Sequence, residues 1–257
     1  MIVVPSQLAA LRRSTDRLLA GVRELTDERI RRPSSLAGWT RAHVVGHLAA
    51  HARGLIRVTE AAERGDLVDP YPGGSEGRAR EIEAAATRPA SALSGELADA
   101  VGALDERWSS LGEDVWQRPT RSSGGERPLG AAVLSRWTEV EVHHADLGIG
   151  YGPADWPDDY VTAVLPGVVA GLPRRAAAPP AQTWLLRGAT TRQSWLVDAT
   201  GDPKVVPGDA AAQHVVATRD HDLLAWLLGR TPGEPGWVRE SEDPQTALAL
   251  PGWFPYP

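Results

Sequence analysis

The chain has 257 residues, 42% hydrophobic and 23% charged, a composition that excludes a disordered or fibrous protein. The length allows one large domain or two modest ones. The net charge of −6 argues against a nucleic-acid or anionic-membrane partner, and no apolar run approaches the roughly 18 residues that span a bilayer. Because the first residues also lack the pattern of a signal peptide, we expect a cytoplasmic protein.

Apolar residues at helical spacing dominate the chain up to about residue 170. Together with capping and breaking residues, the spacing predicts helices over residues 6–25, 40–64, 76–86, 89–111, 129–147 and 158–170. Ser6 is a suitable N-cap for the first helix, and Gly65 and Gly148 are suitable ends for two later ones. Residues 71–74 and 119–126 are rich in Gly, Pro and Ser, which predicts loops.

The pattern changes after residues 172–180, whose prolines and alanines are typical of an interdomain linker. Beyond them the sequence predicts strands over 183–187, 194–198, 204–206, 213–217 and 237–239, and a helix over 221–228. We place the boundary near residue 178. The predicted fold class is mostly α, with a helical domain over residues 1–172 and a small α+β domain over residues 178–257.

Five of the seven histidines fall in two short clusters. In the first, His43, His47 and His51 are spaced four apart and share one face of a predicted helix. In the second, Glu139 and His143 are also four apart, and Glu141 and His144 are three apart. A Glu and a His at this spacing, joined by a His from another helix, is an arrangement of metal ligands found in bundle cores. Two imidazoles and one carboxylate suit zinc with an open coordination position, and they also suit non-haem iron.

Ordinary roles remain open for these residues, because histidines on helices more often face solvent or lie in the core with a hydrogen-bond partner. One feature favours a metal site. The predicted helix that carries Glu139 has an apolar strip of Val133, Trp137 and Val140 beside it. A charged glutamate near the core is costly unless it is paired or bound to a metal.

The chain has no cysteine, which excludes disulfides, thiolate metal ligands and a protein thiol nucleophile. Any thiolate in its chemistry must therefore belong to a bound small molecule. Lys204 is the only lysine, so Schiff-base chemistry is also excluded unless this residue carries it.

Four stretches of the chain resemble the mycothiol-dependent maleylpyruvate isomerase family, which belongs to the DinB-like superfamily of metal-binding bundles. They are residues 38–48 (GWTRAHVVGHL), 71–83 (YPGGSEGRAREIE), 136–148 (RWTEVEVHHADLG) and 223–230 (LLAWLLGR). The last stretch is similar to part of the sterol-carrier-like domain that is fused to these enzymes. The resemblance covers nearly the whole chain and implies a DinB-like four-helix bundle followed by a small α+β domain.

Zinc ligands at His47, Glu139 and His143 are implied by this resemblance, and the other two histidines of the first cluster are then not ligands. His144 points about 100° away from His143 on a helix, so we do not expect it in the set. Two roles are open for Asp146, which can orient an imidazole or serve at the end of the helix.

The activity implied by the resemblance is a zinc- and thiol-dependent cis–trans isomerase that converts maleylpyruvate to fumarylpyruvate in gentisate breakdown, with mycothiol as cofactor. The substrate is a dianion, so arginines are expected to bind its carboxylates. Arg230 matches a family arginine that reaches the active site. Arg78 is a second candidate, and Arg80 and Arg53 are alternatives to it. The alternative for Arg230 is a cation that stabilises the end of a helix.

Superfamily members share the metal bundle but differ in their thiol and reaction. The alternatives are therefore a metal-dependent thiol S-transferase that uses mycothiol, ergothioneine or bacillithiol, and a non-catalytic metal-binding regulatory protein. Another divalent metal in place of zinc is also open. As partners we expect only a dianionic substrate and a thiol cosubstrate, and we expect a monomer.

Overall fold

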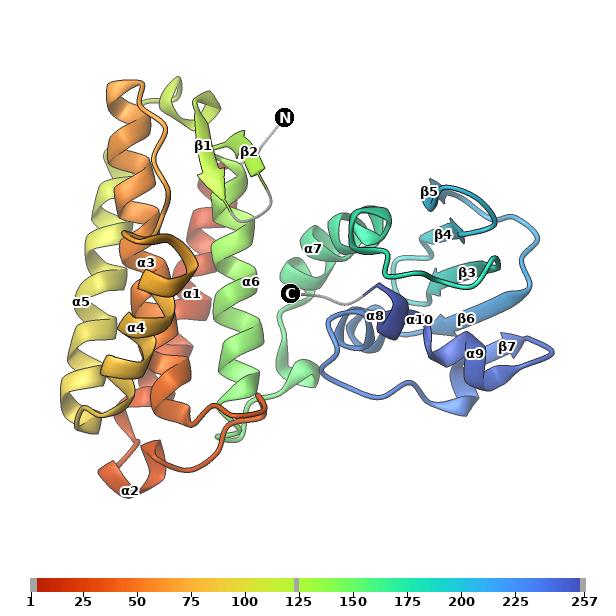
Figure 1. Ribbon diagram of the computed structural model, residues 1–257, viewed down its shortest axis with the longest axis horizontal. Helices are drawn as coiled ribbons and strands as arrows, with labels where there is room; N and C mark the ends of the chain where they lie inside the picture. The colour runs from red at the N-terminus through yellow and green to blue at the C-terminus, as the bar shows by residue number, and fades with distance from the viewer. Residues whose placement is uncertain (1–3, 123–124, 255–257) are drawn as a thin grey trace. The chain divides into compact units, whose positions relative to one another are not determined.

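Four long helices pack into a bundle in the first part of the computed structural model, which describes residues 4–122 and 125–254 (Figure 1). They are α1 (Val4–Arg23), α3 (Arg41–Arg64), α5 (Ala90–Ser109) and α6 (Ala131–Asp146). Both α1 and α3 contact α5 and α6, so the four helices surround one core. Each helix contributes fully buried side chains, among them Leu18, Leu48, Leu97 and Val140. The predicted helical first part is therefore confirmed.

Helix α3 begins and ends where its sequence predicts. The N-cap residue is Thr40, and its backbone N–H donates to Nδ1 of His43 in the first turn of the helix (3.1 Å). Gly65 follows the last helical residue with a φ of +80°, a left-handed conformation that favours glycine.

Helix α4 (Gly74–Ala86) packs very closely on α3. The reason is Gly46 of α3, where a Cβ atom would lie only 2.6 Å from the Cβ of Ala85. The missing side chain lets the two helices approach, and this approach places α4 against the histidine-bearing part of α3.

A two-stranded hairpin corrects the prediction of a loop over residues 119–126. Strand β1 (Pro119–Ser122) pairs antiparallel with β2 (Gly125–Pro128), and residues 123–124 lie outside the described residues. Thr120 is buried, and its hydroxyl donates to the carbonyl of Arg127 (3.1 Å). Polar and apolar residues do not alternate along these strands, so the hydrophobic pattern does not predict them. A short helix α2 (Asp27–Ile30), which buries Ile30, was also not predicted.

The second part of the chain holds a five-stranded sheet in the order β5-β4-β3-β6-β7. Its strands are β3 (Thr183–Gly188), β4 (Ser194–Asp198), β5 (Lys204–Pro207), β6 (His214–Thr218) and β7 (Val238–Glu240). The β3–β6 pair is parallel and the other pairs are antiparallel. At the centre, Leu185 lies opposite Leu196 on one side and Val215 on the other.

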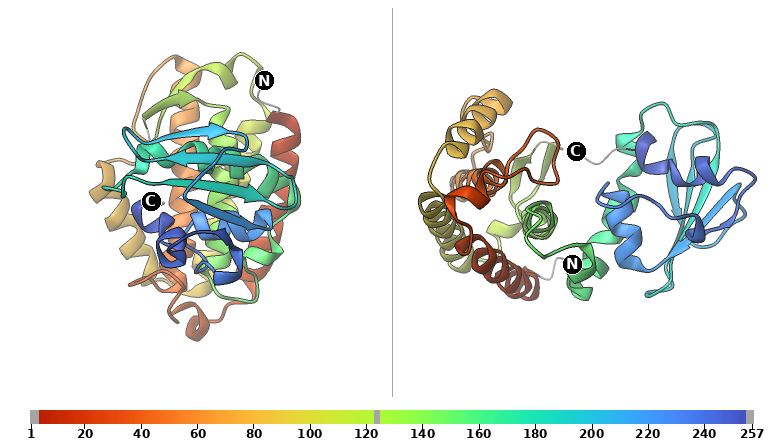
Figure 2. Two further views of the ribbon diagram at one scale, coloured as in Figure 1. Left: turned by 90° about the vertical axis from the view of Figure 1, so that its right-hand side faces the viewer. Right: turned by 90° about the horizontal axis from the view of Figure 1, so that it is seen from below.

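Helices α7 (Asp158–Ala170) and α8 (Asp220–Leu227) pack together on one face of this sheet (Figures 1 and 2). Two short helices, α9 (Pro244–Leu248) and α10 (Leu250–Trp253), follow β7. Short 3₁₀ helices occupy Val115–Gln117, Pro153–Asp155, Leu172–Arg175 and Pro235–Trp237. The predicted α+β character of this part is confirmed.

The chain divides into two compact units, Met1–Gly152 and Pro153–Pro257. The predicted boundary lies between residues 172 and 178, after α7. In the structure α7 packs against α8, and His221 Nε2 lies 3.0 Å from the carbonyl oxygen of Trp156. These contacts place α7 in the second unit. No described helix is both long and apolar enough to cross a membrane.

Candidate metal centre

The two histidine clusters meet where α3 packs against α6. His47 comes from α3, and Glu139 and His143 lie one turn apart on α6. His47 Nε2 is 2.8 Å from Glu139 Oε2 and 3.1 Å from His143 Nε2. His143 Nε2 is 3.2 Å from Glu139 Oε2, so the three atoms form a triangle. Within the described residues this is the one group of three or more His, Asp and Glu side chains close enough to hold a metal.

The triangle has the size that a tetrahedral zinc ion needs. Zinc binds imidazole nitrogen and carboxylate oxygen at about 2.0–2.2 Å, which separates neighbouring ligand atoms by about 3.3–3.6 Å. The observed distances of 2.8–3.2 Å are slightly shorter, so the side chains need to separate by only a few tenths of an ångström. Three protein donors leave the fourth position open, as in catalytic zinc sites. The residues therefore fit a divalent metal.

Asp146 orients the imidazole of His143. The Nδ1–H group of His143 donates to Asp146 Oδ2 (2.9 Å), and the Asp146 side chain is buried. With the proton on Nδ1, the lone pair of Nε2 points toward the triangle. Of the two roles left open for Asp146, the geometry fits the orientation of a ligand.

Arg78 reaches His47 from α4. Its Nη2 atom is 3.0 Å from His47 Nδ1. A guanidinium only donates hydrogen bonds, so Nδ1 accepts, and a neutral ring then carries its proton on Nε2 and donates it to Glu139. The contact with Arg78 therefore keeps the His47 proton on Nε2, and Nε2 has to lose this proton before it can bind a metal.

Burial and hydrogen bonding shift the pKa values of all three triangle residues. Burial lowers the pKa of His47. Burial alone would raise the pKa of Glu139, but the charges and hydrogen bonds of the neighbouring histidines hold it well below its usual range. Burial also opposes the charged form of His143, but hydrogen bonds to Asp146 and Glu139 outweigh burial and raise its pKa. Glu139 is thus ionised at neutral pH, as a metal ligand must be.

His51 lies beside the triangle and pairs with Arg136. Its Nδ1 atom accepts from Arg136 Nη1 (3.2 Å), which also donates to the backbone carbonyl of Leu48 (2.9 Å). His51 Nε2 then carries the ring proton and lies 4.0 Å from Glu139 Oε1. Burial lowers the pKa of His51 to about 3, so its ring is neutral at neutral pH.

The other members of the two clusters have different contacts. His43 accepts a hydrogen bond from the N-cap residue of α3, as described above. His144 stacks on Tyr151, with ring centres 3.9 Å apart and planes 6° from parallel. Glu141 is buried and accepts hydrogen bonds from the hydroxyls of Ser14 and Tyr151. The structure brings none of these three residues into the triangle.

The two arginines predicted to bind substrate lie in different units. Arg78 is at the triangle, with its guanidinium carbon 5.7 Å from the ring centre of Tyr71. Arg230 follows α8 in the second unit, where its Nη1 atom donates to the carbonyl of Leu228 (2.7 Å). This contact fits the helix-end alternative. Binding of substrate by Arg230 stays a prediction.

Sequence reasoning missed Tyr71 and Arg136 as neighbours of the triangle. Arg136 stands three residues before Glu139 and so shares its face of α6, a spacing that could have identified it. Tyr71 lies in a stretch quoted for the family resemblance, but spacing alone does not connect it to the histidines.

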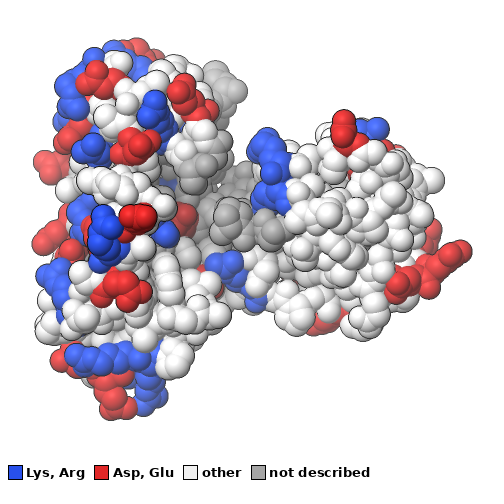
Figure 3. Space-filling view, in the orientation of Figure 1, with Lys and Arg blue, Asp and Glu red and all other residues white. Residues whose placement is uncertain are grey.

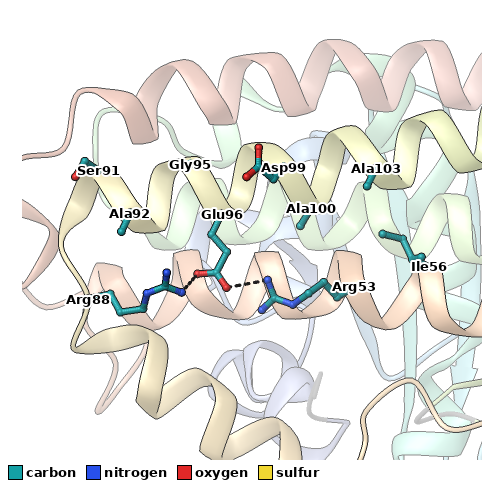
Figure 4. A pocket seen from close by; sticks show the side chains of 10 residues that line it. All are labelled: Arg53, Ile56, Arg88, Ser91, Ala92, Gly95, Glu96, Asp99, Ala100 and Ala103. Atoms are coloured by element: carbon teal, nitrogen blue, oxygen red, sulfur yellow. Dashed lines mark hydrogen bonds and ion pairs between the residues drawn. The ribbon is translucent and has the colours of Figure 1, made fainter.

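A surface groove of about 560 Å³ lies elsewhere on the bundle, between α3 and α5 (Figure 4). Glu96 in this groove binds Arg53 (3.0 Å) and Arg88. None of the triangle residues lines it. On the face of this unit drawn in Figure 3, acidic and basic side chains are interspersed.

Comparisons with known proteins point to one family. The family described as "Mycothiol maleylpyruvate isomerase N-terminal domain" matches residues 11–148. Among solved structures, the chain is similar to the mycothiol-dependent maleylpyruvate isomerase, with a TM-score of 0.76, 22% identity, and 89% of this chain and 90% of that chain covered. A histidine-to-alanine mutant of that enzyme gives a TM-score of 0.76 at 22% identity, with 91% of both chains covered. No curated protein matches the chain significantly. At this identity the structural likeness establishes a shared fold.

Proposed function

This chain belongs to the mycothiol maleylpyruvate isomerase N-terminal domain family, and on that premise we propose that it is a zinc- and thiol-dependent isomerase converting maleylpyruvate to fumarylpyruvate. The observation that carries the proposal is the meeting of His47, Glu139 and His143 in a chain without cysteine. Three protein donors leave a coordination position for a thiol, and that thiol has to come from a cosubstrate. Mycothiol is the first candidate because the similar solved enzyme is described as dependent on it.

In this proposal the triangle residues hold the metal, and Asp146 fixes the ring of His143 through its Nδ1–H group. A bound divalent metal supplies a Lewis acid that lowers the pKa of a thiol, so that a thiolate is available at neutral pH. Glu139 is already ionised and needs to lose no proton to serve as a ligand.

Arginines have to hold the substrate while its geometry changes. The cis double bond must lose its double-bond character for rotation to occur and must then form again as trans. Both carboxylates of the dianion need a cation during this rotation, because a charged group taken out of water is costly without a partner. Arg78 at the triangle would bind one carboxylate, and we propose Arg230 for the other.

The test begins with the purified protein and its metal content. We expect one equivalent of zinc, and we expect His47→Ala to lose most of it while His144→Ala, the matched control on α6, retains it. The isomerisation of maleylpyruvate is then followed with mycothiol, ergothioneine, bacillithiol and no thiol. Activity that requires both zinc and one of the thiols supports the proposal.

Two other outcomes would replace this function with an alternative. Thiol-dependent consumption of an electrophile such as monochlorobimane, without isomerisation of maleylpyruvate, would identify a thiol S-transferase. Tight zinc binding with neither reaction would favour the non-catalytic regulatory protein.

A further inference from the structure

Arg136 is a buried arginine beside the candidate metal centre, and one of its terminal nitrogens has no hydrogen-bond partner among the described residues. It lies on α6, and only 1% of its surface is exposed. Its Nη1 atom donates to the carbonyl of Leu48 (2.9 Å) and to His51 Nδ1 (3.2 Å), both on α3. Its Nη2 atom is buried and has no hydrogen-bond partner among the residues that the structure describes.

The contacts of Nη1 explain how Arg136 ties α6 to α3, but they leave Nη2 unexplained. A buried charged donor without a protein acceptor is unfavourable, so such a group pairs with a ligand or an ordered water or serves a function. Burial lowers the pKa of Arg136 to about 10, and the guanidinium is still charged at neutral pH. The partner that Nη2 lacks is therefore an acceptor, and an anion satisfies it best.

The groups around Arg136 connect it with the metal triangle. Glu139 and Tyr71 lie near enough to Arg136 for their charges to shift its pKa. Arg78 lies over the ring of Tyr71 at 5.7 Å and reaches His47 Nδ1 at 3.0 Å. Two guanidiniums and a phenol thus belong to the same polar cluster as the three candidate ligands.

The charge of this cluster matches a dianion. Arg78 and Arg136 balance the carboxylates of Glu139 and Asp146, while the ligand imidazoles are neutral when they bind a metal. A divalent metal then leaves an excess of two positive charges as long as no thiolate is bound, which is the state of the protein titrated below. A ligand with two carboxylates neutralises this excess, whereas a monoanion neutralises half of it.

We propose that Arg136 Nη2 binds the same substrate carboxylate as Arg78, inside the first unit, which makes Arg136 a substrate-binding residue of the candidate metal centre. The inference rests on the proposed function, whose substrate is a dianion. Burial raises the pKa of Tyr71, so its hydroxyl keeps its proton and is available as a second donor to the same carboxylate. Arg136 differs from Arg230 in that it needs no contribution from the second unit.

The experiment compares two arginine-to-lysine variants of the full-length, zinc-loaded protein. Arg136→Lys keeps one charged donor for Leu48 and His51 but lacks the second nitrogen. Arg53→Lys is the matched control, because Arg53 lies on α3 and pairs with Glu81 and Glu96 away from the triangle. Each protein is titrated with maleate, and with acetate as a monoanion, by calorimetry. Zinc content and the urea midpoint are measured on the same samples.

We expect Arg136→Lys to retain zinc and its urea midpoint but to bind maleate at least tenfold more weakly, with a matching rise in KM for maleylpyruvate. Arg53→Lys should bind maleate within twofold of the wild type. Unchanged maleate binding by Arg136→Lys, or no maleate binding by the wild type, would show that Arg136 only ties the helices together. If maleate binding depends on Arg136 but neither the wild type nor a variant isomerises maleylpyruvate, the inference holds and the proposed reaction is wrong.

A second variant covers the case in which Arg136→Lys does not fold. The double change Arg136→Met and His51→Leu replaces both hydrogen-bonding partners by apolar side chains, which leaves no buried polar group unpaired between them. It should fold and lose maleate binding to the same extent. Wild-type affinity for maleate in this variant would also overturn the inference.

Discussion

Arg78 has two opposing effects at the candidate metal centre. It would supply a cation for substrate, but it also donates to His47 Nδ1 and adds positive charge next to the metal position. We therefore expect Arg78→Ala to bind zinc more tightly, by about tenfold or ~1.4 kcal/mol, while its isomerase activity falls. Zinc affinity is measured by competition with a chromogenic chelator. Weaker zinc binding in Arg78→Ala would mean that Arg78 supports the ligand instead of competing with the metal.

His51 makes the stability of the metal-free protein depend on pH. Its pKa is about 3 in the folded protein and about 6.5 in an unfolded chain, so only the unfolded state gains a proton as the pH falls below about 6.5. The free energy of unfolding should then fall by up to about 1.4 kcal/mol per pH unit from this residue. His47, whose pKa is also lowered, adds to the loss. His143, whose pKa is raised, gains its stabilisation at higher pH and adds no further change well below about pH 6.5.

The variant His51→Gln isolates this contribution, because an amide oxygen can still accept from Arg136 but does not titrate in this range. Urea unfolding with a chelator present, between pH 6.5 and 5, should show a shallower slope for the variant than for the wild type. Equal slopes would mean that His51 is protonated in the folded protein.

At the scale of single residues, the sequence predicts which side chains share one face of a helix, but it does not predict contacts between helices. The spacing of Glu139 and His143 follows from the helix period alone. The pairing of His51 with Arg136 depends on how α3 packs against α6, and no local pattern encodes it. The choice of His47 among three equally spaced histidines came from the family resemblance for the same reason.

Among the elements, the close packing of α4 on α3 has a single cause that can be tested. A methyl group at Gly46 would lie 2.6 Å from the Cβ of Ala85, so Gly46→Ala must push α4 away. We expect a loss of about 1–3 kcal/mol in the free energy of unfolding, together with reduced activity, because α4 carries Arg78. Gly95→Ala is the matched control. Gly95 lies on α5, and a Cβ atom at this position would meet nothing within 4 Å. It should be neutral or stabilising by up to about 1 kcal/mol in urea unfolding.

Elements with a clear apolar period were predictable, and elements without one were not. Helix α7 matches its predicted range, and α3 starts one residue later than predicted because Thr40 is its cap. The hairpin of β1 and β2 is polar, so its strands have no alternating pattern. The parallel pairing of β3 with β6 joins segments far apart in the sequence, and strand propensity does not specify such a partner.

For the molecule as a whole, the proposed role of the second unit in the chemistry depends on Arg230. If it binds a substrate carboxylate, Arg230→Ala should keep its zinc and fold but lose roughly 2–4 kcal/mol of transition-state stabilisation, or about 10²–10³ in rate. Arg230→Lys should recover only part of this loss, because a point charge does not reproduce a bidentate contact. The measurement is kcat/KM for maleylpyruvate, with zinc content and urea midpoint as controls.

A different result would assign Arg230 to the end of α8. Its contact with the Leu228 carbonyl stabilises that helix end, and such an interaction contributes about 0.3–1 kcal/mol. If Arg230→Ala is fully active but slightly less stable, stabilising the end of α8 is the only role of Arg230.

The position of the triangle along the chain has a consequence for the folding of the bundle. His47 and His143 are 96 positions apart, so one ion bound to both would close a long loop of backbone. In the chain-entropy description of cross-links, closing a loop of this length restricts the unfolded ensemble by about 4–5 kcal/mol. Loading the metal should then slow amide hydrogen exchange in α3 and α6 together, because neither helix can open without breaking its bonds to the same ion. The ion proposed for chemistry would also determine how often the bundle opens.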